Sequence, residues 1–196
     1  LFICSTPIGN LGDVSFRLIE TLKKVDLIAS EDTRTAKKLL KKYGIDKKEL
    51  TSYHDFNKEK KIDSICKRLI RGEDAALISE SGTPVIQDPG YKLINECINK
   101  NISLTVIPGP NAGISALVLS GFSPDNFLFL GFLPKPRGKR KKKLIEVKNL
   151  PYTLIFYESP KRLKKLLKEI HEIMGDRKVC VAREITKLYE EVIRGN

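Results

Sequence analysis

Short apolar runs alternate with amphipathic stretches through the first half of the chain. The short continuous runs predict strands at 1–4, 27–29, 75–78 and 104–107. Between them, apolar residues recur at helical spacing, which predicts helices near 14–25, 35–43, 62–70, 93–98 and 114–119. We expect Asp13 to cap the first of these helices and Gly44 and Gly72 to end the next two. This alternation is typical of a parallel sheet covered by helices, so we predict an α/β fold.

The pattern changes after Gly121. The expected strands there are 127–132, which is aromatic, 153–157 and 178–182, around a helix at 160–174. We therefore predict two α/β lobes, an N-terminal lobe of residues 1–110 and a C-terminal lobe of residues 111–196.

Composition indicates a folded protein with a sizeable core. The 196 residues are 41% hydrophobic, and no run of about 18 apolar residues is present. The chain does not open with a basic leader or a cleavage site, so we expect a cytoplasmic protein with no membrane partner. The four cysteines never form a CxxC pair, which favours structural thiols over zinc ligands or disulfides. His54 and His171 lack metal-ligand spacing; we expect both to be structural or at the surface, and no metal.

The charge is strongly positive and unevenly distributed. A formal net charge of +12 favours polyanionic partners without choosing among RNA, DNA and acidic lipid. Seven basic residues lie within nine positions, namely Lys135, Arg137, Lys139, Arg140, Lys141, Lys142 and Lys143. Pro134, Pro136 and Gly138 predict that this segment is a loop. Such a loop is either a solvated lysine-rich segment or a contact to a phosphate backbone.

Three loops rich in Gly, Pro and hydroxyl residues follow predicted strands, at 5–13, 79–90 and 108–113. In parallel sheets, ligands bind at the carboxyl ends of the strands. Glycine lets backbone groups approach a ligand and proline stiffens the loop, so these loops suit a nucleoside-bearing cofactor. Any one of them is also compatible with an ordinary β-α turn. Neither GxGxxG nor GxxxxGK[ST] occurs, which disfavours a standard dinucleotide or Walker-type site.

A polar cluster, Glu31-Asp32-Thr33-Arg34, follows the strand at 27–29. Asp32 or Thr33 is expected to cap the next helix, but capping does not account for Glu31 or Arg34. The guanidinium of Arg34 suits bidentate phosphate binding, and a carboxylate suits the orientation of a hydroxyl nucleophile. Similar clusters at 157–162 and 183–187 also follow strands, and each is equally compatible with a capped strand end.

Six motifs in order then carry a resemblance to a known family. They are STPIGNLGD (5–13), EDTR (31–34), SGTPVIQDPG (81–90), PGPNA (108–112), FYESPKRL (156–163) and ARE-T (182–186). Together they resemble the bacterial ribosomal RNA small subunit methyltransferase I family, within the tetrapyrrole methylase superfamily. The match covers nearly the whole chain.

The resemblance implies S-adenosylmethionine-dependent 2′-O-methylation of a cytidine in the decoding region of small-subunit (16S) ribosomal RNA. It implies a class III methyltransferase fold, with a mostly parallel sheet in the N-terminal lobe and a mixed sheet in the C-terminal lobe. The cofactor would lie between the lobes, and the protein would be a homodimer that acts on free RNA or on the small ribosomal subunit. By analogy, the cofactor-binding residues are Pro7, Ile8, Gly9, Gly82, Thr83, Ile86, Asn111, Ala112, Tyr157 and Ala182.

The residues do not single out a general base. The catalytic candidates are Glu31, Asp32, Arg34 and Glu184, with Glu158 as a further carboxylate, and Arg162 and Arg183 join the basic segment as candidates for phosphate binding. Two departures from the family pattern stand out. Glu80-Ser81 replaces the usual Asp-Ala, and family members continue beyond Asn196 into a strand that completes the second lobe, so we expect this lobe to be incomplete.

Two other functions stay open. A tetrapyrrole methylase of cobalamin or siroheme synthesis would have the same fold, although a small macrocycle does not require a dense basic segment. A non-enzymatic RNA-binding assembly module would bind RNA in a salt-sensitive manner without affinity for the cofactor.

Overall fold

The computed structural model describes residues 1–54 and 58–196. The chain divides into two compact units, which we call unit 1 (Leu1–Asn111) and unit 2 (Ala112–Asn196). Within the described residues, no helix is both long enough and apolar enough to cross a membrane.

Unit 1 is built on a five-stranded sheet in which every paired strand is parallel to its neighbour. Its strands are β1 (Phe2–Cys4), β2 (Leu27–Ser30), β3 (Glu49–Ser52), β4 (Ala75–Ile78) and β5 (Thr105–Ile107). Their order in the sheet is β3-β2-β4-β1-β5. Because all strands run the same way, the loops that follow them emerge at one edge of the sheet.

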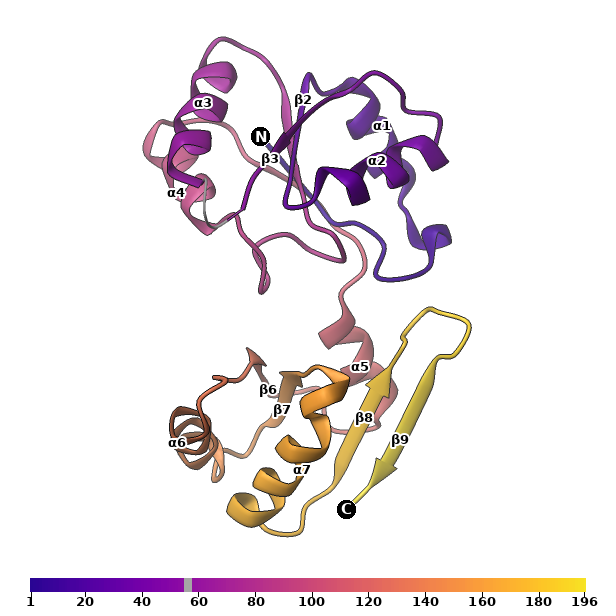
Figure 1. Cartoon of the computed structure of the whole chain (residues 1–196), viewed down its shortest axis with the longest axis vertical. Coiled ribbons are helices and arrows are strands. Elements are labelled where there is room, and N and C mark those ends of the chain that lie inside the picture. The colour runs from indigo at the N-terminus through magenta and orange to yellow at the C-terminus, as the bar shows by residue number, and fades with distance from the viewer. Residues whose placement is uncertain (55–57) are drawn as a thin grey trace. The chain divides into compact units, whose positions relative to one another are not determined.

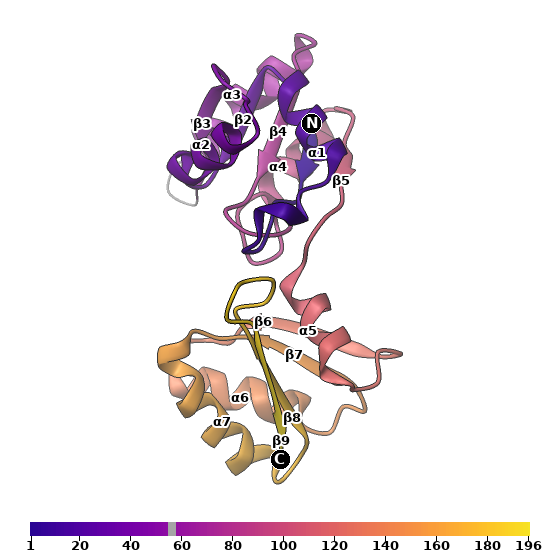
Figure 2. The same cartoon turned by 90° about the vertical axis from the view of Figure 1, so that its right-hand side faces the viewer.

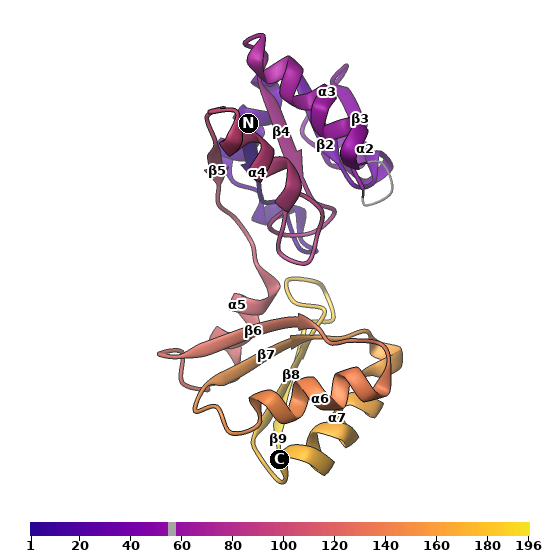
Figure 3. The same cartoon turned by 90° about the vertical axis from the view of Figure 1, so that its left-hand side faces the viewer.

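Helices cover both faces of this sheet (Figure 1, Figure 3). The helices of unit 1 are the 3-10 helix η1 (Leu11–Asp13), α1 (Phe16–Lys24), α2 (Thr33–Lys42), α3 (Lys58–Ile70) and α4 (Tyr91–Asn99). On one face, Leu18 and Leu22 of α1 pack in a cluster with Ile28 of β2. On the other face, Ile65 of α3 and Leu93 of α4 belong to a second cluster. Burial on both faces explains why β2 and β4 are apolar without alternation.

The apolar pattern predicted most of unit 1, with two exceptions. Asp13 does not cap α1, because it belongs to η1; the hydroxyl of Ser15 accepts the Leu18 N–H at 3.1 Å instead. The strand β3 was not predicted. It contains one large apolar residue, Leu50, and among the described residues it pairs with β2 only, so it carries little of the apolar signal that marks the inner strands.

Unit 2 contains two separate two-stranded sheets. Its elements are α5 (Ala112–Ser120), β6 (Phe127–Phe132), α6 (Arg137–Val147), β7 (Thr153–Tyr157), α7 (Pro160–Met174), β8 (Val179–Arg183) and β9 (Glu191–Gly195). Strands β6 and β7 are parallel, whereas β8 and β9 form an antiparallel pair. Helices α6 and α7 lie side by side (Figure 2), and they share a core of Leu133, Leu144, Leu166 and Ile170. The fold is α/β, with a parallel sheet in unit 1 and mixed strand directions in unit 2, as predicted.

The predicted loop at 135–143 is wrong, because residues from Arg137 onward form α6. Pro136 stands at the N-cap with φ −63°, a conformation that favours the start of a helix, and the Lys and Arg residues after it are good helix formers. The buried residues of α6 are Arg140, Leu144 and Val147, which lie on one face of the helix. The charged Arg140 therefore occupies a buried position where an apolar residue is usual. Strand β9 was also not predicted, whereas the helix at 160–174 is confirmed.

Candidate functional site

The three loops that follow β1, β4 and β5 are bonded into one surface. The Ser5 N–H donates to the Ile107 carbonyl at 3.0 Å, which joins the first loop to the end of β5. Thr6 and Gly82 exchange two backbone hydrogen bonds, of 2.9 and 3.1 Å, and the Ser5 hydroxyl donates to the Thr83 hydroxyl oxygen at 3.0 Å. The loops therefore hold one another in place at the carboxyl edge of the sheet.

Two glycines allow this close approach. A Cβ added to Gly109 would lie 2.9 Å from the Ser5 Cβ, closer than two carbon atoms pack. Gly82 has φ +83°, and a Cβ there would lie 3.2 Å from the Ile8 Cγ2 and 3.4 Å from the Pro110 carbonyl oxygen. Glycine is therefore required at both positions by the contacts between the loops themselves.

The predicted cofactor-binding residues of unit 1 all lie in these loops. Pro7 and Gly82 are buried, whereas Gly9 and Ile86 are exposed. The half-buried ones are Ile8, Thr83, Asn111 and Ala112, the last of which begins unit 2 as the first residue of α5. A buried loop framework thus presents a partly exposed rim, an arrangement that suits a bound nucleoside.

An open pocket of about 510 Å³ lies beside these loops in unit 1. It is lined by Glu31, Asp32, Thr33, Arg34, Ser52, His54 and Glu80. The parallel register explains this gathering, because Ser30 at the end of β2 pairs with both Ile78 of β4 and Ser52 of β3. Residues that follow three neighbouring strands therefore meet at one place.

Asp32 and Arg34 form a closed pair at this pocket. Asp32 accepts the Arg34 backbone N–H at 2.7 Å as the cap of α2, and also accepts the guanidinium, with an Nη2 to Oδ2 distance of 2.6 Å. The hydrogen bonds from the Arg34 side chain and backbone lower the pKa of Asp32 to about 2. The side chain of Arg34 is 87% exposed. Asp32 is therefore a weak proton acceptor that orients an exposed cation.

The carboxylates of Glu31 and Glu80 lie close enough to Asp88 to influence its protonation. Burial is the largest cause, and together with the negative charges of Glu31 and Glu80 it raises the pKa of Asp88 to about 6. The pocket therefore has an acidic side, opposed by the cation of Arg34.

Sequence reasoning missed two residues of this pocket, Ser52 and His54. His54 was expected to be structural or at the surface, but it is half-buried and lines the pocket. Both residues arrive through β3, whose weak apolar pattern hid the strand. The signal that would have found them is the polar run Thr51-Ser52-Tyr53-His54 directly after Leu50, read as the end of an edge strand.

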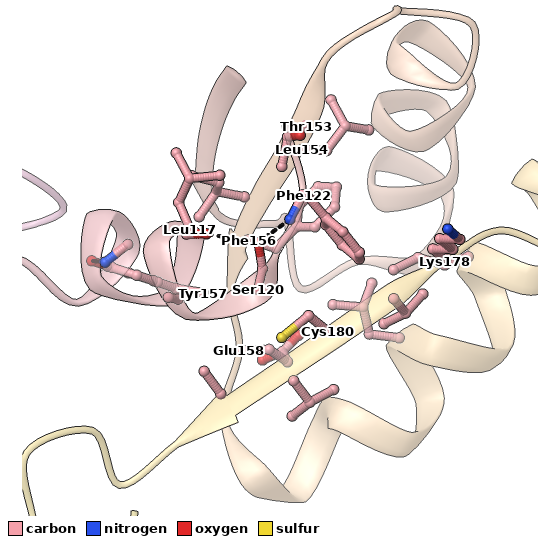
Figure 4. Close-up of a pocket in the computed structure, with 18 of the residues that line it drawn as sticks. Leu117, Ser120, Phe122, Thr153, Leu154, Phe156, Tyr157, Glu158, Lys178 and Cys180 are labelled. Carbon is pink, nitrogen blue, oxygen red and sulfur yellow. Dashed lines mark hydrogen bonds between the residues drawn. The ribbon is translucent and has the colours of Figure 1, made fainter. Parts of the chain in front are cut away.

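Unit 2 contains a cavity of about 1350 Å³ (Figure 4). Apolar and aromatic side chains from α5, β7, α7 and β8 line most of it, including Leu117, Leu154, Phe156 and Val181. Among the described residues, β7 pairs with β6 only and β8 pairs with β9 only, so each has an unpaired edge.

Four polar residues of the clusters at 157–162 and 183–187 line this cavity, namely Tyr157, Glu158, Arg183 and Glu184, and Ala182 lines it beside them. The hydroxyl oxygen of Tyr157 accepts the Gly113 N–H at 3.0 Å. Glu158 is nearly buried and binds Arg162 at 2.6 Å, and Glu184 binds Lys187 at 3.3 Å. Tyr157, Glu158 and Glu184 are therefore already bonded to neighbours within unit 2.

Some Lys and Arg side chains of the basic segment at 135–143 bind carboxylates, and others do not. Arg140 is buried, and its guanidinium binds the Glu169 carboxylate at 2.5 and 2.8 Å. It also donates to the carbonyls of Pro134 and Lys135, so the expectation that Arg140 contacts RNA is wrong. Carboxylates also lie within 4.0 Å of Arg137, Lys141 and Lys143. In the part of the chain that the structure describes, Lys135, Lys139 and Lys142 are exposed and unpaired.

The cysteines and the metal-binding groups give no metal centre in residues 1–54 and 58–196. No group of three or more His, Cys, Asp or Glu side chains there is arranged to hold a metal ion. All four cysteines are free thiols, and Cys4, Cys66 and Cys97 are buried.

Comparisons with known proteins add a family. A family model described as Tetrapyrrole (Corrin/Porphyrin) Methylases matches residues 1–196. Proteins named ribosomal RNA small subunit methyltransferase I are 49% identical in Halalkalibacterium halodurans, 47% in Thermotoga maritima and 46% in Bacillus subtilis, each over the whole of this chain. The chain spans 67%, 87% and 66% of their respective lengths.

A solved structure supports the fold separately. The crystal structure of the methyltransferase CobJ matches 99% of this chain and 84% of its own, with a TM-score of 0.71. At 15% identity, this likeness concerns the fold alone.

Proposed function

Because the chain belongs to the ribosomal RNA small subunit methyltransferase I family of tetrapyrrole methylases, we propose that it methylates a cytidine ribose 2′-oxygen in the decoding region of small-subunit ribosomal RNA. S-adenosylmethionine is the proposed donor, and it supplies a methyl group already activated by a positively charged sulfur. One observation supports this proposal most: the loops and the polar cluster that carry the family motifs meet at one edge of the unit 1 sheet.

The residues at this edge fit a nucleoside-bearing cofactor. The glycines at 82 and 109 keep the loops in contact where a Cβ would separate them, and this gives the rim a preset shape. A preset rim loses little conformational entropy on binding. We propose that the cofactor-binding residues of unit 1 are Pro7, Ile8, Gly9, Gly82, Thr83, Ile86 and Asn111. The contributions of Ala112, Tyr157 and Ala182 stay predictions.

The geometry narrows the choice of proton acceptor for the ribose hydroxyl. Asp32 is held by Arg34 and has a lowered pKa, so it is a poor base. Glu158 is nearly buried against Arg162, and Glu184 binds Lys187. Glu31 lines the open pocket and is exposed, so a ribose hydroxyl can reach its carboxylate, and we propose it as the group that takes the hydroxyl proton.

Arg34 has a different proposed role. Its guanidinium is exposed at the pocket, and the ion pair with Asp32 fixes its orientation. The guanidinium N–H groups that Asp32 does not bind remain available to a phosphate next to the target nucleotide. Exposure of the ribose hydroxyl requires that nucleotide to be splayed from its neighbours, which is typical of recognition of structured single-stranded RNA.

The test is methyl transfer from radiolabelled S-adenosylmethionine to small ribosomal subunits that lack the modification, followed by nuclease mapping of the label. We expect the label on one cytidine ribose. Glu31→Gln is expected to lower kcat by about 10²-fold to 10⁴-fold while cofactor affinity is retained. Glu20→Gln, on the exposed face of α1, is the matched control and is expected to behave as wild type.

Other outcomes identify the two rival functions. Cofactor binding without RNA labelling, together with transfer to a cobalamin or siroheme precursor, would establish the tetrapyrrole methylase. Salt-sensitive RNA binding with no affinity for S-adenosylmethionine would establish a binding module.

We also propose that the protein is a homodimer. Large apolar side chains are exposed in each unit, for example Phe16 at 90% and Leu188 at 88%, and association with a second copy would remove such area from water. Sedimentation equilibrium of the full chain tests this proposal, and a monomer at micromolar concentration would contradict it.

A further inference from the structure

Three lysines of α7 share one face and are free. Lys161, Lys164 and Lys168 follow one another at i, i+3 and i+7, a spacing that places side chains on the same side of a helix. All three are exposed. Within the described residues, none of them forms an ion pair or a side-chain hydrogen bond. Their charges are therefore available to an external partner.

The acidic residues of α7 do not neutralise this face, because they point toward α6. Glu169 binds the buried Arg140, and Arg137 lies 3.7 Å from the same carboxylate. Glu172 lies 3.4 Å from Lys141. The carboxylates of α7 thus stabilise the packing of the two helices, and Lys161, Lys164 and Lys168 remain uncompensated on the outside.

Unit 2, which contains α7, also carries more positive charge than unit 1. Residues 112–196 contain 18 Lys and Arg against 9 Asp and Glu, a net charge of +9. Residues 1–111 contain 18 against 15, a net charge of +3. Most of the formal net charge of +12 therefore belongs to unit 2, where the free lysines of α7 lie.

We propose that the face formed by Lys161, Lys164 and Lys168 binds the phosphate backbone of the RNA substrate. This inference rests on the proposed function, and it adds a surface that the basic segment at 135–143 did not predict. Seven residues of helix at 1.5 Å per residue span about 10 Å, a length that covers a few consecutive phosphates. Lys161 lies in the first turn of α7, three residues after Glu158, so the face begins within the polar cluster at 157–162.

The chemistry of this face favours RNA over a lipid surface. Binding to a membrane interface requires apolar side chains that enter the acyl boundary next to the cations. The exposed residues of α7 from Lys161 to Glu172 are Lys161, Lys164, Lys165, Lys168, His171 and Glu172, all of them polar. A polar, cationic helix face matches a solvated polyanion.

The test is a triple variant of the full chain, Lys161→Gln with Lys164→Gln and Lys168→Gln. Gln keeps the helix propensity of Lys and removes its charge. We expect the KM for unmodified small ribosomal subunits to rise by about tenfold or more near physiological salt, with kcat at saturating substrate retained. The slope of log affinity against log salt is expected to fall by about 2, since each phosphate contact on a single strand contributes about 0.7.

The matched control is Lys38→Gln with Lys41→Gln and Lys42→Gln on α2 of unit 1. These lysines are also exposed and unpaired in the described part of the chain, and the variant removes the same charge. We expect its KM and salt slope to match those of wild type. Circular dichroism melting of both variants checks that the helices are retained.

Three outcomes would overturn the inference. One is an unchanged KM and salt slope in the α7 variant. Another is an equal rise in KM in both triple variants, which would show that the total charge of the protein, and not this face, causes the effect. The third is weaker binding to phosphatidylglycerol vesicles with unchanged RNA affinity. Failure of the proposed function is distinct, because wild-type protein would then transfer no methyl group to RNA.

Discussion

The two units reach stability by different means. Unit 1 buries a complete five-stranded parallel sheet under helices on both faces, and its core is apolar. Unit 2 has two short sheets with unpaired edges, a large cavity, and a buried ion pair between α6 and α7. Regular apolar burial suits the unit that must hold loops in a fixed shape.

The two units also differ in how they use an ion pair between an arginine and a carboxylate. In unit 2, Arg140 and Glu169 are both buried, so their bonds hold two helices together. In unit 1, Arg34 is 87% exposed and Asp32 is 23% exposed, so their bonds orient a cation toward solvent. Similar chemistry therefore serves packing in one unit and a candidate binding site in the other, and burial decides which.

The largest expected effect comes from breaking the buried pair. Arg140→Ala leaves the carboxylate of Glu169 buried without its partner, and we expect the free energy of unfolding of unit 2 to fall by about 3–5 kcal/mol. Urea unfolding followed by circular dichroism measures it. Lys142→Ala, on the exposed side of the same helix, is the control and is expected to change stability by less than about 0.5 kcal/mol. An equal, small effect of both variants would remove the proposed contrast between the units.

A smaller effect is expected from the loop contacts of unit 1. Gly109→Ala places a Cβ 2.9 Å from the Ser5 Cβ, so the first and third loops must move apart. We expect a loss of about 1–3 kcal/mol in stability, together with at least tenfold weaker binding of S-adenosylmethionine measured by calorimetry.

The matched glycine lies in unit 2. A Cβ added to Gly138 in α6 meets no atom within 4 Å, so Gly138→Ala is expected to stabilise the helix by up to about 1 kcal/mol and to leave cofactor affinity unchanged. Unchanged cofactor affinity in Gly109→Ala would show that the loops do not form the cofactor site.

The smallest expected effect is a pH dependence confined to unit 1. The pKa of Asp88 is raised to about 6 by burial and by Glu31 and Glu80, above its ordinary value. The folded state therefore binds the proton more tightly than the unfolded chain, so this contribution to stability is present below about pH 4 and is lost as the pH rises through about 6. We expect Asp88→Asn to gain about 1–2 kcal/mol relative to wild type between pH 4 and pH 7.5. A difference that does not change with pH would contradict this assignment.

Much of the candidate site was predictable from the chain. The loops at 5–13, 79–90 and 108–113 were expected at one edge because they follow apolar runs, and the structure joins them through Ser5, Thr6 and Gly82. His54 was not predictable in this way. It reaches the pocket only because the edge strand β3 pairs with β2, and an edge strand needs few apolar residues.

The sequence by itself determined the order of most helices and strands, the α/β class and the family. It did so because burial imposes a local period on apolar residues and because the motifs are contiguous. Only the tertiary structure decided which cations are free. Arg140 is buried against Glu169, 29 residues away, while Lys161, Lys164 and Lys168 stay exposed. The reason is physical: the pairing of charges depends on distances in space between separate helices, which neither composition nor local pattern contains.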